Sequence, residues 1–197
     1  MVICKSLDNL PQLEKSVVTI GSFDGMHCGH MEILKTVQLR SIEEKASSVV
    51  ITFDPHPKSV LNASNYRHFQ ILTDIKKKIE ILQKLGIDYL VIVPFDLKFA
   101  KFSAKEFLST FIVNNFNPIN IVIGYDHHFG NKQEGNADFL KKQSELFEFN
   151  VDVVKPLLID NLCVSSTEIR KYLQNGEILM ANKFLGWDYE LSGIVVK

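Results

Sequence analysis

The sequence has few cysteines, almost no net charge and no long apolar run, and each shortage excludes a class of protein. Its three cysteines, Cys4, Cys28 and Cys163, are too few and too irregularly spaced for a disulfide framework or a four-cysteine zinc site. With 22 basic and 23 acidic side chains the formal charge is −1, so we expect no nucleic-acid-binding surface. No apolar run approaches the roughly 20 residues that cross a bilayer. We therefore expect a cytoplasmic protein with reduced thiols and neither a nucleic-acid nor a membrane partner.

The two most common nucleotide-binding motifs are also missing. The sequence contains no GxGxxG and no complete Walker loop. Gly130 and Gly135 have the glycine spacing of a Walker loop, but Asn136 and Ala137 follow them where Lys and Ser or Thr are needed. Binding of a nucleotide through a P-loop is therefore disfavoured.

Short apolar segments alternate with amphipathic ones along the chain, as in an α/β protein. Strands are expected at 17–20, 48–53, 89–93, 119–123 and 151–154, and helices at 30–44, 73–85, 103–114, 137–147 and 177–185. Continuous apolar strands separated by helices predict a parallel sheet with helices on both faces. Ligands of such sheets bind beyond the carboxyl ends of the strands. The informative residues should therefore follow positions 20, 53, 93 and 123.

Some of the expected helices carry signals at their ends or along one face. Thr73 is a candidate N-cap of the 73–85 helix, and Gly86 is a candidate residue just beyond its end. Ser103 and Glu106 have the spacing of a capping box. In the 30–44 helix, the apolar stripe is expected to include Ile42.

The most informative segment is the glycine-rich turn at 21–30, GSFDGMHCGH, which leads from a strand into a helix. Glycines allow a tight turn and a close approach of the backbone to a ligand. The N-terminus of the following helix offers unpaired N–H groups that suit a phosphate. His27 and His30 are spaced to share a face, so both imidazoles can donate hydrogen bonds to that phosphate. A metal site that includes Cys28 is the alternative interpretation, but no fourth ligand is evident.

This GxFDGxHxGH segment resembles the adenylyltransferase module of the bacterial bifunctional riboflavin kinase/FAD synthetases. HxGH alone is typical of the wider nucleotidyltransferase superfamily, whereas Phe23-Asp24-Gly25 is more specific to the FAD-synthetase branch. The resemblance runs from about Val17 to the C-terminus. It implies a Rossmann-like nucleotidyltransferase fold of the α/β class, with residues 1–186 as the nucleotidyltransferase domain.

Three further segments support the resemblance. In the family, the FDPHP segment at 53–57 helps to form the nucleotide and flavin pocket, which implies FMN contacts from Asp54, Pro55, His56 and Pro57. The segment at 124–130, GYDHHFG, matches the family pattern at Asp126, Phe129 and Gly130, and the implied FMN contacts there are Asp126, His128 and Phe129.

The 124–130 segment also departs from the family. His127 and His128 stand where the family usually has Phe and Arg, and Gln133 stands at a frequent Arg position. A histidine lacks the bidentate fork of arginine. These departures put two cationic contacts in doubt.

The third segment, VSSTEIR at 164–170, resembles the ISSTxIR motif of the family. Ser165 and Glu168 also fit a capping box, so an ordinary helix start is an equal alternative. If the segment is functional, Ser165, Ser166, Thr167 and Arg170 are expected to hold the terminal phosphates of ATP. The family usually has a basic residue at the place of Glu168, to which we assign no role.

The resemblance implies transfer of AMP from ATP to FMN, with FAD and pyrophosphate as products. His27 and His30 would be the catalytic residues, since imidazole donors can stabilise charge as it develops on the phosphates. Mg²⁺ would be held mainly by the phosphates of ATP and by water, with no metal-ligating residue in the protein. The residues implied in ATP binding are Gly21, Phe23, Asp24, Gly29, Gly124, Ser165, Ser166, Thr167 and Arg170.

Two other functions are weighed against FAD synthesis. One is adenylyl or cytidylyl transfer to another phosphate-bearing acceptor, and the other is a catalytically silent nucleotide- or flavin-binding module. A separate expectation concerns residues 187–197, where 189–196 has the pattern of a strand. The resemblance implies that they are a linker and the first strand of an absent C-terminal riboflavin kinase domain. Two alternatives stay open: the natural protein carries that domain, or it is naturally short.

Overall fold

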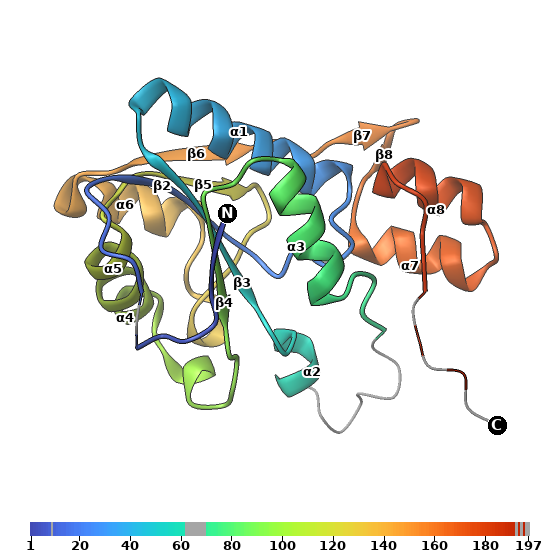
Figure 1. The fold of residues 1–197 in the computed structure, drawn as a ribbon, viewed down its shortest axis with the longest axis horizontal. Helices are drawn as coiled ribbons and strands as arrows, with labels where there is room; N and C mark the ends of the chain where they lie inside the picture. The colour runs from blue at the N-terminus through green and yellow to red at the C-terminus, as the bar shows by residue number, and fades with distance from the viewer. Residues whose placement is uncertain (9, 62–69, 192, 194, 196–197) are drawn as a thin grey trace.

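The computed structural model describes residues 1–8, 10–61, 70–191, 193 and 195. The chain forms a six-stranded parallel sheet in the order β1-β4-β3-β2-β5-β6, with a separate antiparallel hairpin, β7-β8 (Figure 1). The strands are β1 (Val2–Cys4), β2 (Ser16–Ile20), β3 (Ser47–Phe53), β4 (Tyr89–Val93), β5 (Pro118–Gly124), β6 (Asn150–Val154), β7 (Leu158–Ile159) and β8 (Leu162–Cys163).

The helices alternate with these strands. They are α1 (Cys28–Glu44), α2 (Pro57–Leu61), α3 (Ile75–Lys84), the short 3₁₀ helix η2 (Phe99–Lys101), α4 (Ala104–Glu106), the π-helix η3 (Phe107–Val113), α5 (Asn114–Phe116), the 3₁₀ helix η4 (Asn131–Gln133), α6 (Ala137–Phe147), α7 (Ser166–Gln174) and α8 (Ile178–Leu185). None of the helices in the described ranges is both long and apolar enough to cross a membrane.

The strand order places a switch point at the centre of the sheet. The chain runs outward from β2 through β3 to β4, then returns to β5, which pairs with β2 on its other side. Because parallel crossovers are right-handed, this reversal sends the later helices to the opposite face. Leu34 and Leu82, from α1 and α3, pack in one core cluster, whereas Leu108 and Leu140 pack in another on the opposite face. The expected parallel sheet with helices on both faces is therefore confirmed.

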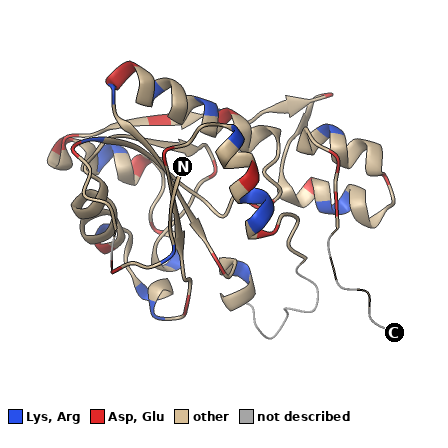
Figure 2. Ribbon diagram, in the orientation of Figure 1, with Lys and Arg blue, Asp and Glu red and all other residues tan. Residues whose placement is uncertain are grey.

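Helices α7 and α8 lie beside the sheet and have a core of their own (Figure 1). Ile169 and Phe184 are fully buried in this third cluster. Helix α8 ends beside the start of α1, where the Cys28 Sγ lies 3.8 Å from the Lys183 carbonyl oxygen. Basic and acidic residues are distributed over the helices around the sheet and over α7 and α8 (Figure 2). This distribution agrees with the balanced charge of the sequence.

Most expected elements are confirmed to within two residues, but several details differ. Asp74, rather than Thr73, is the N-cap of α3, since its Oδ1 accepts from the Lys77 N–H at 2.8 Å. Gly86 does follow α3 with a φ of 74°. Ile42 is 74% exposed and does not belong to the buried stripe of α1, where Ser41 is buried instead.

The expected helix at 103–114 is interrupted by the π-helix η3. Its capping box is confirmed, because Ser103 and Glu106 bond reciprocally. Farther along, the Thr110 hydroxyl donates to the Glu106 carbonyl oxygen at 2.6 Å, and the Asn115 side chain donates to the Phe111 carbonyl oxygen at 2.8 Å. Such side-chain bonds compete with the regular helical ladder, and a periodicity argument does not reveal them.

Strand β1, helix α2 and the β7-β8 hairpin were not expected from the sequence. The expected strand at 189–196 includes residues 192, 194 and 196, which lie outside the described residues. That strand, and the division at residue 187, remain predictions.

The loop 129–135 provides a test of local packing. Phe129 and Gly135 exchange backbone hydrogen bonds, and the Glu134 carboxylate accepts from the Ala104 N–H at 2.7 Å. Gly130 has a φ of 74°, and a Cβ there would lie 2.6 Å from the Ala104 nitrogen. Gly176 has a similar φ of 77° but open space around it.

We therefore expect Gly130→Ala to destabilise the protein more than Gly176→Ala. Both substitutions put a Cβ into the left-handed region, which costs about 1–2 kcal/mol. Only Gly130→Ala also forces atoms together, which adds about 1–3 kcal/mol. Urea unfolding of both variants and the wild type measures the difference. Equal losses in the two variants would show that the contact with α4 is not restrictive.

Candidate active site

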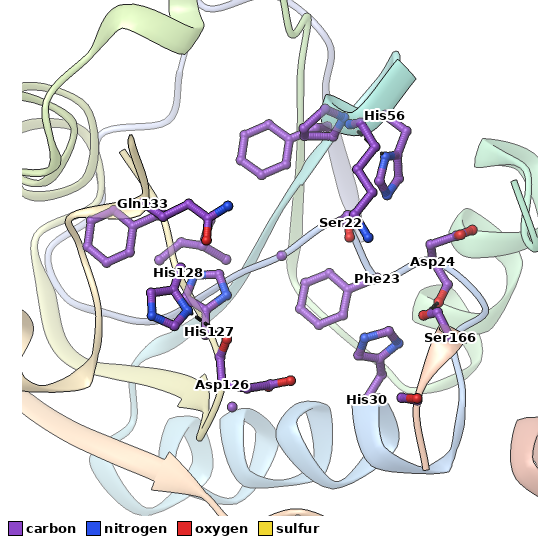
Figure 3. Close-up of a pocket in the computed structure, with 18 of the residues that line it drawn as sticks. Ser22, Phe23, Asp24, His30, His56, Asp126, His127, His128, Gln133 and Ser166 are labelled. Atoms are coloured by element: carbon purple, nitrogen blue, oxygen red, sulfur yellow. Dashed lines mark hydrogen bonds between the residues drawn. The ribbon is translucent and has the colours of Figure 1, made fainter. Parts of the chain in front are cut away.

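A cavity of about 760 Å³ opens beyond the carboxyl ends of β2, β3, β5 and β6. Figure 3 shows His30, Phe23 and Ser166 on one side of it and His127, His128 and Gln133 on another. The position is the switch point of the sheet, where ligands of open α/β sheets bind. The expected site residues that line it are Gly21, Phe23, Asp24, His27, Gly29, His30, His56, Pro57, Gly124, Asp126, His128, Phe129, Ser165, Ser166, Thr167 and Arg170.

His27 and His30 form a stacked pair at the start of α1. Their ring centroids lie 3.6 Å apart with 14° between the planes, and the edge of Phe23 meets His30 at 5.3 Å. His27 is the N-cap of α1, and its Nδ1 accepts a hydrogen bond from the His30 N–H at 3.2 Å. Gly29 lines the cavity beside them, and a Cβ there would lie 3.3 Å from the His27 ring. The turn therefore fixes both rings through backbone geometry as well as through packing.

The hydrogen bonds indicate which ring nitrogen carries the proton. Because His27 Nδ1 accepts a hydrogen bond, the proton of the neutral ring belongs on Nε2. His30 Nδ1 is buried and has no hydrogen-bond partner among the described residues. Placing the His30 proton on Nε2 avoids a buried N–H without an acceptor, the rarer kind of unsatisfied group. Both stacked rings then have Nε2–H as their donor.

Burial keeps these imidazoles neutral at physiological pH. It lowers the pKa of His27 to about 4, although the charge of Asp24 acts in the opposite direction. Burial, followed by the neighbouring His27 and Lys78, holds the pKa of His30 well below its usual value. A stacked pair of imidazoles at this distance would be disfavoured if both were charged. The site therefore contains two neutral donors rather than two cations.

A second helix N-terminus adjoins the first. Ser165 is the N-cap of α7 and accepts from the Glu168 N–H at 3.3 Å, which confirms the cap. The Ser166 hydroxyl donates to the Asp24 carbonyl oxygen at 2.7 Å and so joins α7 to the glycine turn. Thr167 is exposed. Two helix N-termini that border one cavity make it suitable for an anion with several charges.

Asp24 links three segments from a buried position. The residue is 2% exposed, and its Oδ1 accepts from the N–H groups of Leu72 and Thr73 at 2.9 and 3.2 Å. Its Oδ2 pairs with Arg170, which also donates to the Ser166 and Gln70 carbonyl oxygens. The Asp24 carboxylate therefore holds the glycine turn, the 70–73 segment and α7 together.

Aromatic side chains surround another part of the cavity. Phe53 and Phe95 meet edge to face at 5.5 Å, and Phe99 meets Phe107 at 5.7 Å. Phe107 in turn lies 5.7 Å from Phe129. All five rings line the cavity. A planar apolar ligand would find edges and faces of π-systems there.

His56 also lines the cavity. It is 7% exposed, and its Nδ1 accepts from the Lys58 N–H at 3.1 Å, so its proton also belongs on Nε2. Burial lowers the pKa of His56 to about 4, although Asp24 acts in the opposite direction. His56 is thus a third neutral donor.

The loop after β5 places its two histidines differently. His127 stacks with Phe129 at 5.9 Å, and burial lowers the pKa of His127 to about 4. His128 is exposed, and its Nδ1 lies 3.0 Å from the Asp126 carbonyl oxygen. Gln133 is exposed and lines the cavity. Both residues at the usual arginine positions of the family thus border the cavity without supplying a permanent charge.

Asp54 and Pro55 are the two expected site residues that do not line the cavity. Both are exposed, and Asp54 donates its N–H to the Val93 carbonyl oxygen at 3.0 Å. Their proposed contact with FMN therefore finds no support in the geometry of the wall.

Sequence reasoning missed several lining residues that carry charge or polarity. Lys58, Lys132 and Lys155 border the cavity. Their signal was present, since Lys155 directly follows a strand, Lys58 directly follows the 53–57 segment, and Lys132 lies between Gly130 and Gly135. Among the described residues, no group of three or more His, Cys, Asp or Glu side chains could hold a metal ion.

Known proteins resemble this chain over most of its length. A sequence model of the FAD synthetase family matches residues 9–168. The bifunctional riboflavin kinase/FMN adenylyltransferase of Buchnera aphidicola subsp. Acyrthosiphon pisum is 34% identical over 197 residues, which cover 100% of this chain and 62% of that protein. The Listeria monocytogenes protein of the same name is 34% identical over 91% of this chain and 56% of its own length. The chain thus spans about three fifths of the length of such relatives.

The fold has a solved counterpart as well. A crystal structure described as a macrolide-efflux protein from Streptococcus pneumoniae superposes with a TM-score of 0.83 at 29% identity, covering 94% of this chain and 60% of that one. The family match includes the glycine turn, the cavity loops and the start of α7. The chain belongs to the FAD synthetase family.

Proposed function

We propose that this chain transfers AMP from ATP to FMN, giving FAD and pyrophosphate. The observation that carries the proposal is the stacked His27–His30 pair, whose neutral rings line a cavity that also has an aromatic wall. The relatives named above are FMN adenylyltransferases as well as riboflavin kinases, which supports the same reaction. A molecule with a phosphate at one end and a planar ring system at the other matches these two kinds of wall.

In the proposed reaction a phosphate oxygen of FMN attacks the α-phosphorus of ATP. The bond from that phosphorus to the bridging oxygen of pyrophosphate breaks, and pyrophosphate leaves with the electron pair. The attacking phosphate is already ionised near neutral pH, so no strong general base is required. The protein then has to align the two substrates and stabilise the charge that develops on the phosphate oxygens. The neutral Nε2–H groups of His27 and His30 suit that task, because they can donate hydrogen bonds to the phosphate oxygens and carry no negative charge that would repel those oxygens.

Other residues have proposed roles around this centre. Ser165, Ser166 and Thr167 offer the N-terminus of α7 to the β- and γ-phosphates of ATP. Gly21 and Gly124 shape the adenine and ribose site, where a side chain would narrow the cavity. We propose that Asp24 and Arg170 act mainly by holding these segments in place, because the Asp24 carboxylate is already occupied by three donors.

The aromatic wall favours a flavin over other phosphate-bearing acceptors. Phe95, Phe99 and Phe129 can pack against a ring system, whereas the flexible aliphatic chain of phosphopantetheine would use them poorly. His56, Pro57, Asp126 and His128 are proposed to complete the FMN site. A cytoplasmic location, where ATP is abundant, is part of the same proposal.

Mg²⁺ would neutralise charge on the triphosphate when it is bound. The described residues offer no cluster of carboxylates for it, so we propose that phosphates and water supply most of its ligands. We also propose that the natural protein carries a riboflavin kinase domain, as the names and greater lengths of the relatives suggest.

The direct test is FAD formation. Purified protein with ATP, Mg²⁺ and FMN should release one pyrophosphate for each FAD, and His30→Ala should lower kcat about 10²–10³-fold, the usual loss on removing one charge-stabilising donor. Thermal unfolding checks that the variant is folded. Phosphopantetheine and nicotinamide mononucleotide, offered in place of FMN, identify another acceptor if one is preferred. Binding of ATP or FMN without pyrophosphate release would instead identify a silent binding module.

The proposed positioning role of Asp24 has a separate test in stability. Breaking a buried ion pair on one side typically costs about 3–5 kcal/mol. Asp24→Asn and Arg170→Met should each destabilise the protein in urea, and the double variant should lose at least about 1 kcal/mol less than the sum of the two.

The exposed pair Lys171–Glu168 on the same helix, with a 2.6 Å separation, is the matched control. Its double-mutant cycle with Lys171→Met and Glu168→Gln should give a coupling below about 0.5 kcal/mol. Equal couplings for the two pairs would contradict a special role for Asp24.

A further inference from the structure

Lys78 is a buried cation that the proposed reaction has not yet used. It lies in α3 and is 4% exposed. Its neighbours Lys76 and Lys77 suggest a solvated face, but Lys78 shares the apolar stripe of the helix with Ile75 and Leu82. Lys78 does not line the cavity itself. It lies behind the wall that the glycine turn forms.

The ammonium group of Lys78 fixes one carbonyl of that turn. Its Nζ donates to the Ser22 carbonyl oxygen at 2.7 Å, and the Thr52 hydroxyl donates to the same oxygen at 3.2 Å. Ser22 lines the cavity, and the next residue, Phe23, has a φ of 45°, which is uncommon for a side chain of that size. Two donors on one carbonyl therefore hold the backbone where its conformation is least favourable.

The same turn carries the aromatic contact with the imidazole pair. The Phe23 ring meets His30 edge to face at 5.3 Å and 71°, and a Cβ at Gly21 would lie 3.1 Å from that ring. A shift of the Ser22 carbonyl would therefore move Phe23 and, through it, the packing of His30 (Figure 3). Lys78 is connected to the reacting centre by this chain of contacts.

Neutralising Asp24 does not explain why a cation is buried here. The Asp24 carboxylate already accepts from two backbone N–H groups and pairs with Arg170. Burial lowers the pKa of Lys78, although Asp24, Asp54 and Asp74 act in the opposite direction. A lysine whose pKa is lowered by folding has its charged form disfavoured in the native state, so its charge subtracts from stability at neutral pH.

The charge of Lys78 reaches two of the imidazoles. The pKa of His30 is lowered first by burial, then by His27 and then by the positive charge of Lys78. For His56 the groups that act besides burial are Asp24, which raises the pKa, and Lys78, Arg170 and Lys58, which lower it. A cation near neutral donors also adds attraction for phosphate in a region with little water.

We propose that Lys78 is a positioning residue for the adenylyl transfer: from behind the cavity wall it fixes the Ser22 carbonyl and places a positive charge beneath the phosphates. This inference rests on the proposed function, because it assigns Lys78 to the same site. A role in positioning explains why the chain keeps a buried charge that lowers its stability.

The test compares Lys78→Met, which removes the charge at similar length, with Lys78→Arg, which keeps it, and with Lys76→Met. Lys76 lies two positions earlier on α3 and is exposed, so Lys76→Met removes the same charge from the helix surface. We expect Lys78→Met to lower kcat for FAD formation about 10–100-fold, as misplacement of reacting groups does. Lys78→Arg should recover part of kcat, and Lys76→Met should match the wild type.

Two further measurements separate this role from a structural one. Lys78→Met should unfold at the same temperature as the wild type or a higher one at pH 7, since a disfavoured charge has been removed. In NMR titrations without substrates, the pKa values of His30 and His56 should rise in Lys78→Met, because a nearby cation no longer disfavours their protonation. Lys76→Met should leave both values unchanged.

The outcomes distinguish this inference from the proposed function. A wild-type protein that makes no FAD would reject the function, while the histidine titrations would still report on Lys78. Wild-type activity in Lys78→Met, or histidine pKa values unaffected by it, would overturn the inference. If Lys78→Met does not fold, Lys78→Gln replaces it; failure of both to fold would make Lys78 a structural residue and also overturn the inference.

Discussion

The arrangement of the candidate site depends on one buried carboxylate. Asp24 accepts from two backbone N–H groups of the 70–73 segment and pairs with Arg170 of α7, while Ser166 donates to its carbonyl oxygen. These contacts bring together parts of the chain that are about fifty and about 140 residues away in sequence. Because α7 has its own core with α8, packing against the sheet alone would not fix where its N-terminus lies. The contacts of the carboxylate link that N-terminus to the glycine turn, and so to the candidate anion site between α1 and α7.

Hydrogen bonding also decides what the imidazoles can do. His27 and His56 each accept a backbone N–H at Nδ1, which leaves Nε2–H as the donor. Burial keeps both rings neutral. Donors whose tautomer is fixed before the ligand arrives need little reorganisation during transfer, which is how a polar site stabilises developing charge. The glycine turn is thus suited to phosphate through geometry rather than through net charge.

Much of this could be predicted from the sequence, and the failures have physical reasons. The strands and the site at their carboxyl ends follow from apolar periodicity and from the glycine turn, both local signals. Lys78 was missed because three consecutive lysines suggest a solvated face, although its spacing from Ile75 and Leu82 places it on the buried stripe. The bonds of Asp24 and the interruption of the 103–114 helix depend on contacts between side chains and distant backbone. No pattern within one segment encodes them.

The residues at positions 128 and 133 are not the arginines usual in the family. Their replacement affects the electrostatic attraction of an anion to the cavity more than the geometry that would hold the anion. Arg170 lines the cavity but is committed to Asp24, so it adds little unshared charge. Lys58, Lys132 and Lys155 border the same cavity. Once the Arg170–Asp24 pair is set aside, Asp126 is the acidic residue of the described lining, so basic residues exceed acidic ones there. A lysine supplies a point charge without the fork of an arginine, so these residues favour approach of an anion but orient it weakly. Orientation must then come from the two helix N-termini and the imidazole donors, whose directions the backbone fixes. For this chain, the loss of arginines is therefore compatible with a phosphate site that keeps its geometry.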